Sequence, residues 1–140
     1  MGWLLLVILS CYVSFQDITR RIIPNKSCGL IFLITIYLAF VSRSWMYDWD
    51  TFIGICFLLF LYFISFWGGG DTKLAIVFLP AISTQYVLLF LVGIGLLGGV
   101  LVLVYMMVGL IRRTDTIKTS GLPFGIPICV SGLFCVTASI

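Results

Sequence analysis

Two aspartates, Asp17 and Asp71, are the residues of this sequence whose type and placement best suit chemistry. They are two of only five acidic residues, and each lies at the polar end of a long apolar segment. A carboxylate beside hydrocarbon is costly unless it has a partner or a task. Two carboxylates held close together cannot both ionise easily, so they share one proton. Such a pair activates water at one member and polarises a carbonyl at the other. The two aspartates therefore predict peptide hydrolysis at a membrane surface, with acid and base left unassigned.

The residues around Asp71 suggest how a site would be shaped. Gly68-Gly69-Gly70 precedes it, and we expect these glycines to take positive φ and to end the third helix at the membrane edge. The freed backbone groups would pair with an extended substrate strand. Lys73 either helps to hold a carboxylate ionised, or binds a substrate carbonyl, or only covers apolar surface at the start of a helix. For Asp71 itself the alternative is a solvated loop residue.

Composition excludes several other kinds of site. The chain has no histidine, which rules out a serine–histidine triad, a cysteine–histidine dyad and histidine metal ligation. Its five cysteines form no Cys-x-x-Cys pair, so we interpret them as small apolar side chains. Aspartyl chemistry needs only water and the pair, and no metal or organic cofactor is implied. The net charge of +3 comes from basic residues in short loops, which indicate membrane orientation rather than a nucleic-acid surface.

The elements that must position the aspartates are membrane helices. Charged residues make up 9% of the chain, against about a quarter in soluble domains. We predict an all-α polytopic membrane bundle of about six transmembrane helices in a single domain, residues 1–140. Apolar runs lie at about 2–16, 28–42, 51–67, 74–82, 86–111 and 122–139.

Two of these runs carry particular expectations. The run 74–82 is short for a span and contains Pro80, so we expect a tilted or broken helix that continues through Ser83-Thr84-Gln85. In the run 86–111, Gly95 and Gly99 have the small-xxx-small spacing, which predicts close packing against another helix.

The basic loops predict which helix ends share a membrane face. Arg20, Arg21 and Lys26 follow the first run, whereas the loop after the second has only Arg43 beside two aspartates. The loop after the fifth run is again basic, with Arg112, Arg113 and Lys118. Excess Lys and Arg place the first and fifth loops in the cytoplasm. With six spans the third loop joins them, so Asp17, Asp71 and the 112–125 segment converge on one face.

Three blocks of sequence, taken in order, resemble the type IV prepilin peptidases, membrane aspartyl proteases with a Gly-x-Gly-Asp signature. The blocks are Asp17 followed by Ile23-Pro24-Asn25, then Gly68–Leu74 with Asp71-Thr72-Lys73, and then Leu122-Pro123-Phe124-Gly125-Ile126-Pro127. The resemblance implies that Asp17 and Asp71 are the catalytic pair. It implies a shaping role for Gly68, Gly70, Lys73, Pro24, Asn25, Pro123 and Gly125.

The resemblance also implies a substrate and a place in the cell. Such enzymes sit in the inner (cytoplasmic) membrane and remove the short basic leader of prepilins or pseudopilins on the cytoplasmic side. Larger members carry a methyltransferase region, often with Cys-x-x-Cys motifs. We predict none here, as in the short branch that serves tight-adherence (Flp-type) pili. Two other classes remain open: a non-enzymatic membrane subunit of a pilus or secretion machine, and a small transporter whose aspartates bind protons or cations.

Overall fold

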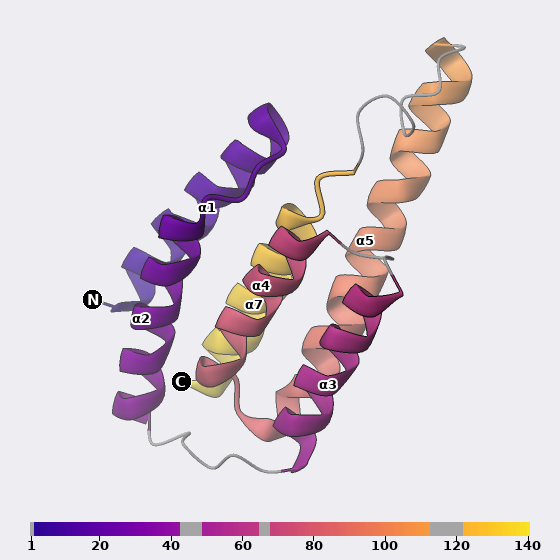
Figure 1. Ribbon diagram of the computed structural model, residues 1–140. Coiled ribbons are helices and arrows are strands. Elements are labelled where there is room, and N and C mark those ends of the chain that lie inside the picture. The colour runs from indigo at the N-terminus through magenta and orange to yellow at the C-terminus, as the bar shows by residue number, and fades with distance from the viewer. Residues whose placement is uncertain (1, 43–48, 65–67, 113–121) are drawn as a thin grey trace.

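The computed structural model describes residues 2–42, 49–64, 68–112 and 122–140, and within them the chain is a bundle of helices (Figure 1). The elements, in chain order, are α1 (Gly2–Arg20), α2 (Asn25–Ser42), α3 (Trp49–Phe63), α4 (Gly69–Phe78), the short 3₁₀ helix η1 (Leu79–Ala81), α5 (Thr84–Arg112) and α7 (Gly125–Ser139). They follow the six apolar runs of the sequence, and the described residues contain no strand. The expected all-α bundle is confirmed.

The surface of the bundle is apolar, as in a membrane protein. The helices Gly2–Arg20, Asn25–Ser42 and Thr84–Leu110 are long and apolar enough to cross a bilayer, and α3 and α7 are shorter apolar helices. Phe40 and Leu88 are each 73% exposed. Large apolar side chains with this exposure are unfavourable in water, whereas lipid solvates them. The bundle therefore presents a surface suited to hydrocarbon.

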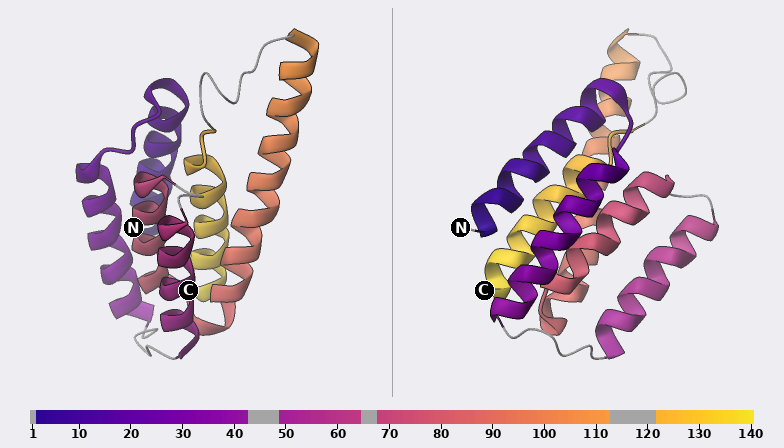
Figure 2. Two further views of the ribbon diagram at one scale, coloured as in Figure 1. Left: turned by 45° about the vertical axis from the view of Figure 1, so that its right-hand side comes forward. Right: turned by 60° about the vertical axis from the view of Figure 1, so that its left-hand side comes forward.

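Helix α4 is the centre of the bundle, where it packs against α2, α3 and α7 (Figure 2). Its side chains Leu74, Ala75 and Phe78 are completely buried. A Cβ at Gly132 of α7 would lie 2.7 Å from Cδ1 of Phe78. Only glycine leaves room for the two helices to approach this closely. This packing fixes the position of α4, whose first turn carries Asp71.

The run 74–82 does not continue through Ser83 as expected. Helix α4 ends at Phe78, η1 contains Pro80, and α5 begins at Thr84. The expected break is present, but the helix does not resume until Thr84, because Pro80 supplies no backbone N–H and Ile82 is extended (φ −99°, ψ 121°). The chain still passes from one end of the bundle to the other before α5 returns (Figure 1). The alternation on which the shared-face prediction depends is therefore preserved.

A buried hydroxyl supports the end of α4 at this break. The Thr35 side chain of α2 is completely buried, and its Oγ1 lies 2.7 Å from the carbonyl oxygen of Val77 and 2.9 Å from that of Phe32. Carbonyls near a helix end need partners from outside the helix. The bond from Thr35 to Val77 thus ties α2 to the last turn of α4.

The expected helix-packing role of Gly95 and Gly99 is wrong. Cβ atoms built at these two positions would meet nothing within 4 Å, whereas one at Gly93 would lie 2.9 Å from the Ser131 hydroxyl oxygen. One at Gly98 would lie 2.9 Å from the Phe124 ring. The glycines of α5 that pack against neighbouring residues are therefore Gly93 and Gly98. Spacing alone does not reveal which face a helix turns to its neighbour.

Three helix ends lie together at one end of the bundle, as the positions of the basic residues in the sequence predict. The end of α1, the start of α4 and the start of α7 lie at one end of the bundle (Figure 1). At the opposite end, the Ser83 backbone N–H donates to the hydroxyl of Ser139, 2.9 Å away. The basic residues Arg43, Arg113 and Lys118, which entered the orientation argument, lie outside the described residues.

Candidate active site

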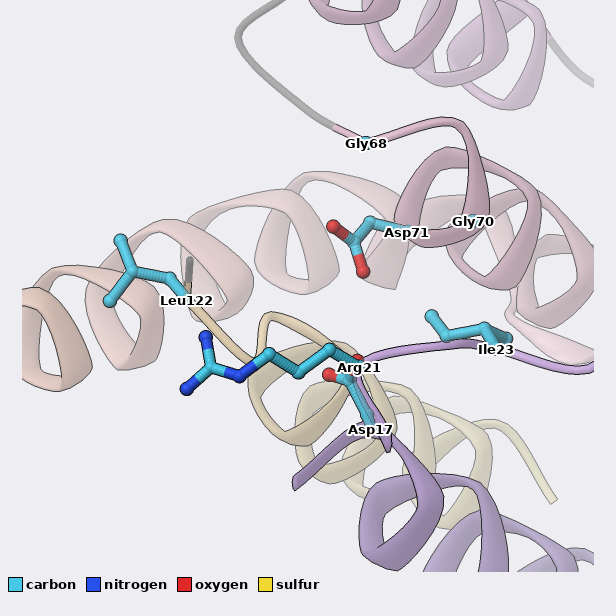
Figure 3. Close-up of a pocket in the computed structure, with 7 residues that line it drawn as sticks. All are labelled: Asp17, Arg21, Ile23, Gly68, Gly70, Asp71 and Leu122. Carbon is cyan, nitrogen blue, oxygen red and sulfur yellow. The ribbon is translucent and has the colours of Figure 1, made fainter. Parts of the chain in front are cut away.

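A cavity of about 330 Å³ lies at the end of the bundle where α1, α4 and α7 meet (Figure 3). Both aspartates line it, although they are more than fifty residues apart in the sequence. Its lining is Asp17, Arg21, Ile23, Gly68, Gly70, Asp71 and Leu122. The structure thus brings together the two carboxylates that the sequence singled out.

Asp17 lies in the last turn of α1, on the face that α1 buries. That face is formed by Leu6, Ser10 and Val13 before it, at helical spacing. Asp17 is 6% exposed, and its Oδ2 accepts a hydrogen bond from the backbone N–H of Gly125, 2.7 Å away. A buried carboxylate oxygen needs such a donor. The first residue of α7 therefore holds the carboxylate at the end of α1.

Gly125 must be a glycine for this contact to exist. A Cβ at this position would lie 2.7 Å from Oδ2 of Asp17 and 3.1 Å from its Cγ. The amide is also at the start of a helix, where backbone N–H groups point outward and favour negative charge. Pro123 is buried just before it. The block that opens α7 thus supplies a donor to Asp17 as well as a turn.

Asp71 is the third residue of α4 and reaches back over the start of its own helix. Gly68 precedes the helix in an extended conformation (φ −66°, ψ 145°), and its N–H donates to the Asp71 carboxylate. This is the acidic half of a capping box. The backbone N–H of Thr72 donates to the Gly68 carbonyl at 3.1 Å, and the Thr72 hydroxyl approaches the same oxygen at 3.2 Å. The position of the Asp71 carboxylate is therefore set locally.

Burial raises the pKa of Asp71 to about 7, and the negative charge of Asp17 adds to the increase, while the hydrogen bond from Gly68 opposes it. The free energy of ionising Asp71 thus depends on Asp17. This coupling is the behaviour expected of two carboxyl groups that share one proton near neutral pH.

The glycines before Asp71 act differently from the expectation. None of Gly68, Gly69 and Gly70 has φ in the left-handed region, and the last two belong to the first turn of α4. Their absent side chains matter instead for close contacts. A Cβ at Gly70 would lie 3.4 Å from Cβ of Ile23, and one at Gly68 would lie 3.2 Å from Oδ2 of Asp71. These glycines therefore allow neighbouring side chains to come close to the start of α4, and they do not supply an unusual backbone conformation.

Five of the seven expected shaping residues do not line the cavity: Lys73, Pro24, Asn25, Pro123 and Gly125. Lys73 is on the exposed side of α4, and its charge acts on the thiol of Cys28. Pro24 lies just before α2, where its carbonyl accepts the backbone N–H of Ser27 at 3.0 Å, and Asn25 is the exposed first residue of that helix. Pro24 and Asn25 affect the site only through the course of the chain between α1 and α2.

Sequence reasoning missed three lining residues: Arg21, Ile23 and Leu122. Arg21 was interpreted as an orientation signal. Its closeness to Asp17 in the sequence, four residues later and just beyond the end of α1, is a signal that both could serve one site. Ile23 and Leu122 belong to blocks already singled out, but nothing in an apolar residue's type marks it as lining a site. Among the described residues, no group of three or more His, Cys, Asp or Glu side chains could hold a metal ion.

The comparison with known families agrees with this fold and site. The sequence model of the type IV leader peptidase family matches residues 4–103, which include both aspartates and the glycine run. No curated protein and no solved structure matches the chain. The architecture and the match define a membrane-embedded peptidase of the aspartic class. The chain belongs to the type IV leader peptidase family and is a leader peptidase of the prepilin type.

Proposed function

We propose that Asp17 and Asp71 are the catalytic pair of an endopeptidase that removes the short basic leader of a prepilin or pseudopilin. The observation that carries this proposal is the shared cavity: two carboxyl groups from α1 and α4 line one space of about 330 Å³. A water molecule occupies about 30 Å³ in the liquid, so the cavity accommodates an attacking water beside a peptide bond. The cavity opens at the end of the bundle, where an extended leader can reach it without crossing the membrane.

The mechanism follows from one proton shared by two carboxyl groups. The ionised aspartate takes a proton from water as the oxygen attacks the scissile carbonyl, and the protonated aspartate gives its proton to the carbonyl oxygen. A tetrahedral diol results, and the two carboxyl groups have exchanged protonation states. As the diol collapses, one of its hydroxyl groups returns a proton to the aspartate that was protonated at the start. The other aspartate donates the proton that it took from water to the leaving amine. The products are a carboxylic acid and an amine, and the pair returns to its starting state.

The membrane orientation is part of the proposal. Arg20, Arg21 and Lys26 lie at the same end of the bundle as the cavity, and loops rich in Lys and Arg remain in the cytoplasm. The active site therefore faces the cytoplasm, in the inner membrane. Leader removal on that side precedes assembly of the mature subunit into a pilus or pseudopilus.

The test is cleavage of a prepilin co-expressed with the wild type, Asp17→Asn or Asp71→Asn, read by gel mobility. Asp50→Asn is the matched control, because Asp50 is an exposed aspartate in the first turn of α3, away from the cavity. We expect cleavage with the wild type and the control, and at least a thousandfold slower cleavage with either site variant. Full activity in either site variant would overturn the dyad. Insertion of the wild type without cleavage of any prepilin tested would favour the non-enzymatic membrane subunit.

A further inference from the structure

Arg21 has an unusual backbone conformation at the edge of the candidate site. Its φ is 52°, and among the described residues it is the only one other than glycine with positive φ. Helices often end with a residue in this left-handed conformation, but the residue is usually glycine because a side chain there is strained. Strained residues that persist tend to lie where the strain serves a function. An arginine here calls for an explanation in terms of its side chain.

The left-handed conformation ends α1 and directs the arginine into the cavity. The Arg21 N–H donates to the Asp17 carbonyl oxygen, 3.1 Å away, which closes the last turn of the helix. The side chain then extends along the cavity from beside Asp17 towards Leu122 (Figure 3). Among the described residues that line this space, Arg21 has the only cationic side chain. A glycine would make the same turn without placing a charge there.

The two carboxyl groups consequently have different electrostatic surroundings. Burial is the largest influence on Asp17 and opposes its ionisation, whereas the Gly125 amide from α7 and the attraction of Arg21 at the end of its own helix favour it. The charge of Asp17 in turn acts on two other titratable groups, Asp71 on α4 and Cys129 on α7. Asp71 receives the Gly68 amide, but no cation is among the main influences on its ionisation. Positive potential is therefore concentrated on one member of the pair.

We propose that Arg21 is a positioning residue that keeps Asp17 as the ionised member, so that Asp17 activates the water and Asp71 supplies the shared proton. This inference rests on the proposed function and deepens it, because it assigns the base and the acid. Arg21 acts through Asp17 and need not touch the substrate. Its charge is the property that matters, so lysine should replace it better than glutamine does.

The experiment compares Arg21→Gln, Arg21→Lys and Arg21→Gly with Arg20→Gln, a matched control. Arg20 is an exposed arginine one residue earlier that does not line the cavity. Single-turnover cleavage is measured against pH. With Arg21→Gln we expect the pH of half-maximal rate on the acid side to rise by about half a unit or more, since losing a nearby opposite charge favours the protonated carboxyl. Arg21→Lys should largely restore the wild-type profile, and Arg20→Gln should match it.

The glycine variant separates charge from backbone strain. Arg21→Gly removes the strained side chain and keeps the turn, so its thermal stability should equal or exceed that of the wild type. Its pH profile should nevertheless move with that of Arg21→Gln. A purely structural role for Arg21 predicts the opposite, with Gly the most active variant and no displacement of the profile. An unshifted profile for both Gln and Gly would overturn the proposal.

A second readout requires no substrate. All five acidic residues are aspartates, so infrared spectroscopy of protein labelled with ¹³C-aspartate follows their protonation in the purified enzyme. Arg21→Gln should move part of this titration to higher pH, and Arg20→Gln should not. If the titration moves but no prepilin is cut, the proposed function fails while the electrostatic role of Arg21 stands. If cleavage needs both aspartates but neither readout responds to Arg21→Gln, only the inference about Arg21 fails.

Discussion

The backbone nitrogen of Gly125 lies 2.7 Å from Oδ2 of Asp17, so the first residue of α7 holds the carboxylate that ends α1. These residues are 108 positions apart in the sequence. The contact joins a helix inside the family match at residues 4–103 to a segment beyond it. The C-terminal helix is therefore an integral part of the site.

Substitution of Gly125 by alanine should disable the enzyme while leaving the fold intact. The added Cβ would lie 2.7 Å from Oδ2 of Asp17, so the carboxylate must move and lose its donor. A misplacement of about 1 Å costs roughly a hundredfold in rate, and we expect at least that loss of prepilin cleavage. Gly95→Ala is the matched control, because a Cβ there meets nothing within 4 Å. Equal activity of the two variants would contradict this assignment.

Cleavage should fall as the pH rises through about 7. The pKa of Asp71 is raised to about 7, first by burial and then by the charge of Asp17, so above this pH the pair loses its shared proton. The rate of cleavage is measured in single turnovers across the pH range, so that the rate of product release does not affect the result. Removing the Asp17 charge should lower the pKa of Asp71, which infrared titration of Asp17→Asn would show. A rate that stays constant into the alkaline range would contradict the shared-proton mechanism.

Asp71→Asn should stabilise the protein at alkaline pH, although it abolishes cleavage. Because the folded pKa is raised from 3.8 to about 7, the folded state binds the proton more tightly than the unfolded state does. The contribution of Asp71 to stability is therefore greatest below its pKa in the unfolded chain. It is lost as the pH rises through the pKa that Asp71 has in the folded protein. Asparagine does not ionise and escapes this loss. We expect a melting temperature a few degrees above wild type at about pH 8, and a smaller gain at about pH 5.

Thr35→Val should destabilise the bundle by about 1–2 kcal/mol, because the carbonyl of Val77 loses its partner in a buried place. Valine nearly preserves the volume, so the change isolates the hydrogen bond. Thermal unfolding in detergent micelles measures it. Thr137→Val is the control, since that exposed hydroxyl bonds within its own helix, to Phe134. A similar loss in both variants would mean that the bond between α2 and α4 contributes nothing specific.

Much of the architecture follows from local features of the sequence. The lengths of the apolar runs and the positions of Asp17 and Asp71 at their ends predict six helices and a site at one end of the bundle. Alternation of the chain across the membrane then makes the two aspartates neighbours. These inferences succeed because the cost of placing charge or unpaired backbone in hydrocarbon acts on each segment separately.

Contacts between helices far apart in the sequence were decided by tertiary structure alone. Gly93 and Gly98 pack against neighbours and Gly95 does not, because the rotation of α5 depends on what lies beside it. In the same way, the carboxylate of Asp17 owes its donor to Gly125, and Arg21 faces the cavity through a backbone conformation that its residue type disfavours. The sequence by itself determined which groups could do the chemistry. Packing determined their orientation, because that depends on close contacts between surfaces that no single segment contains.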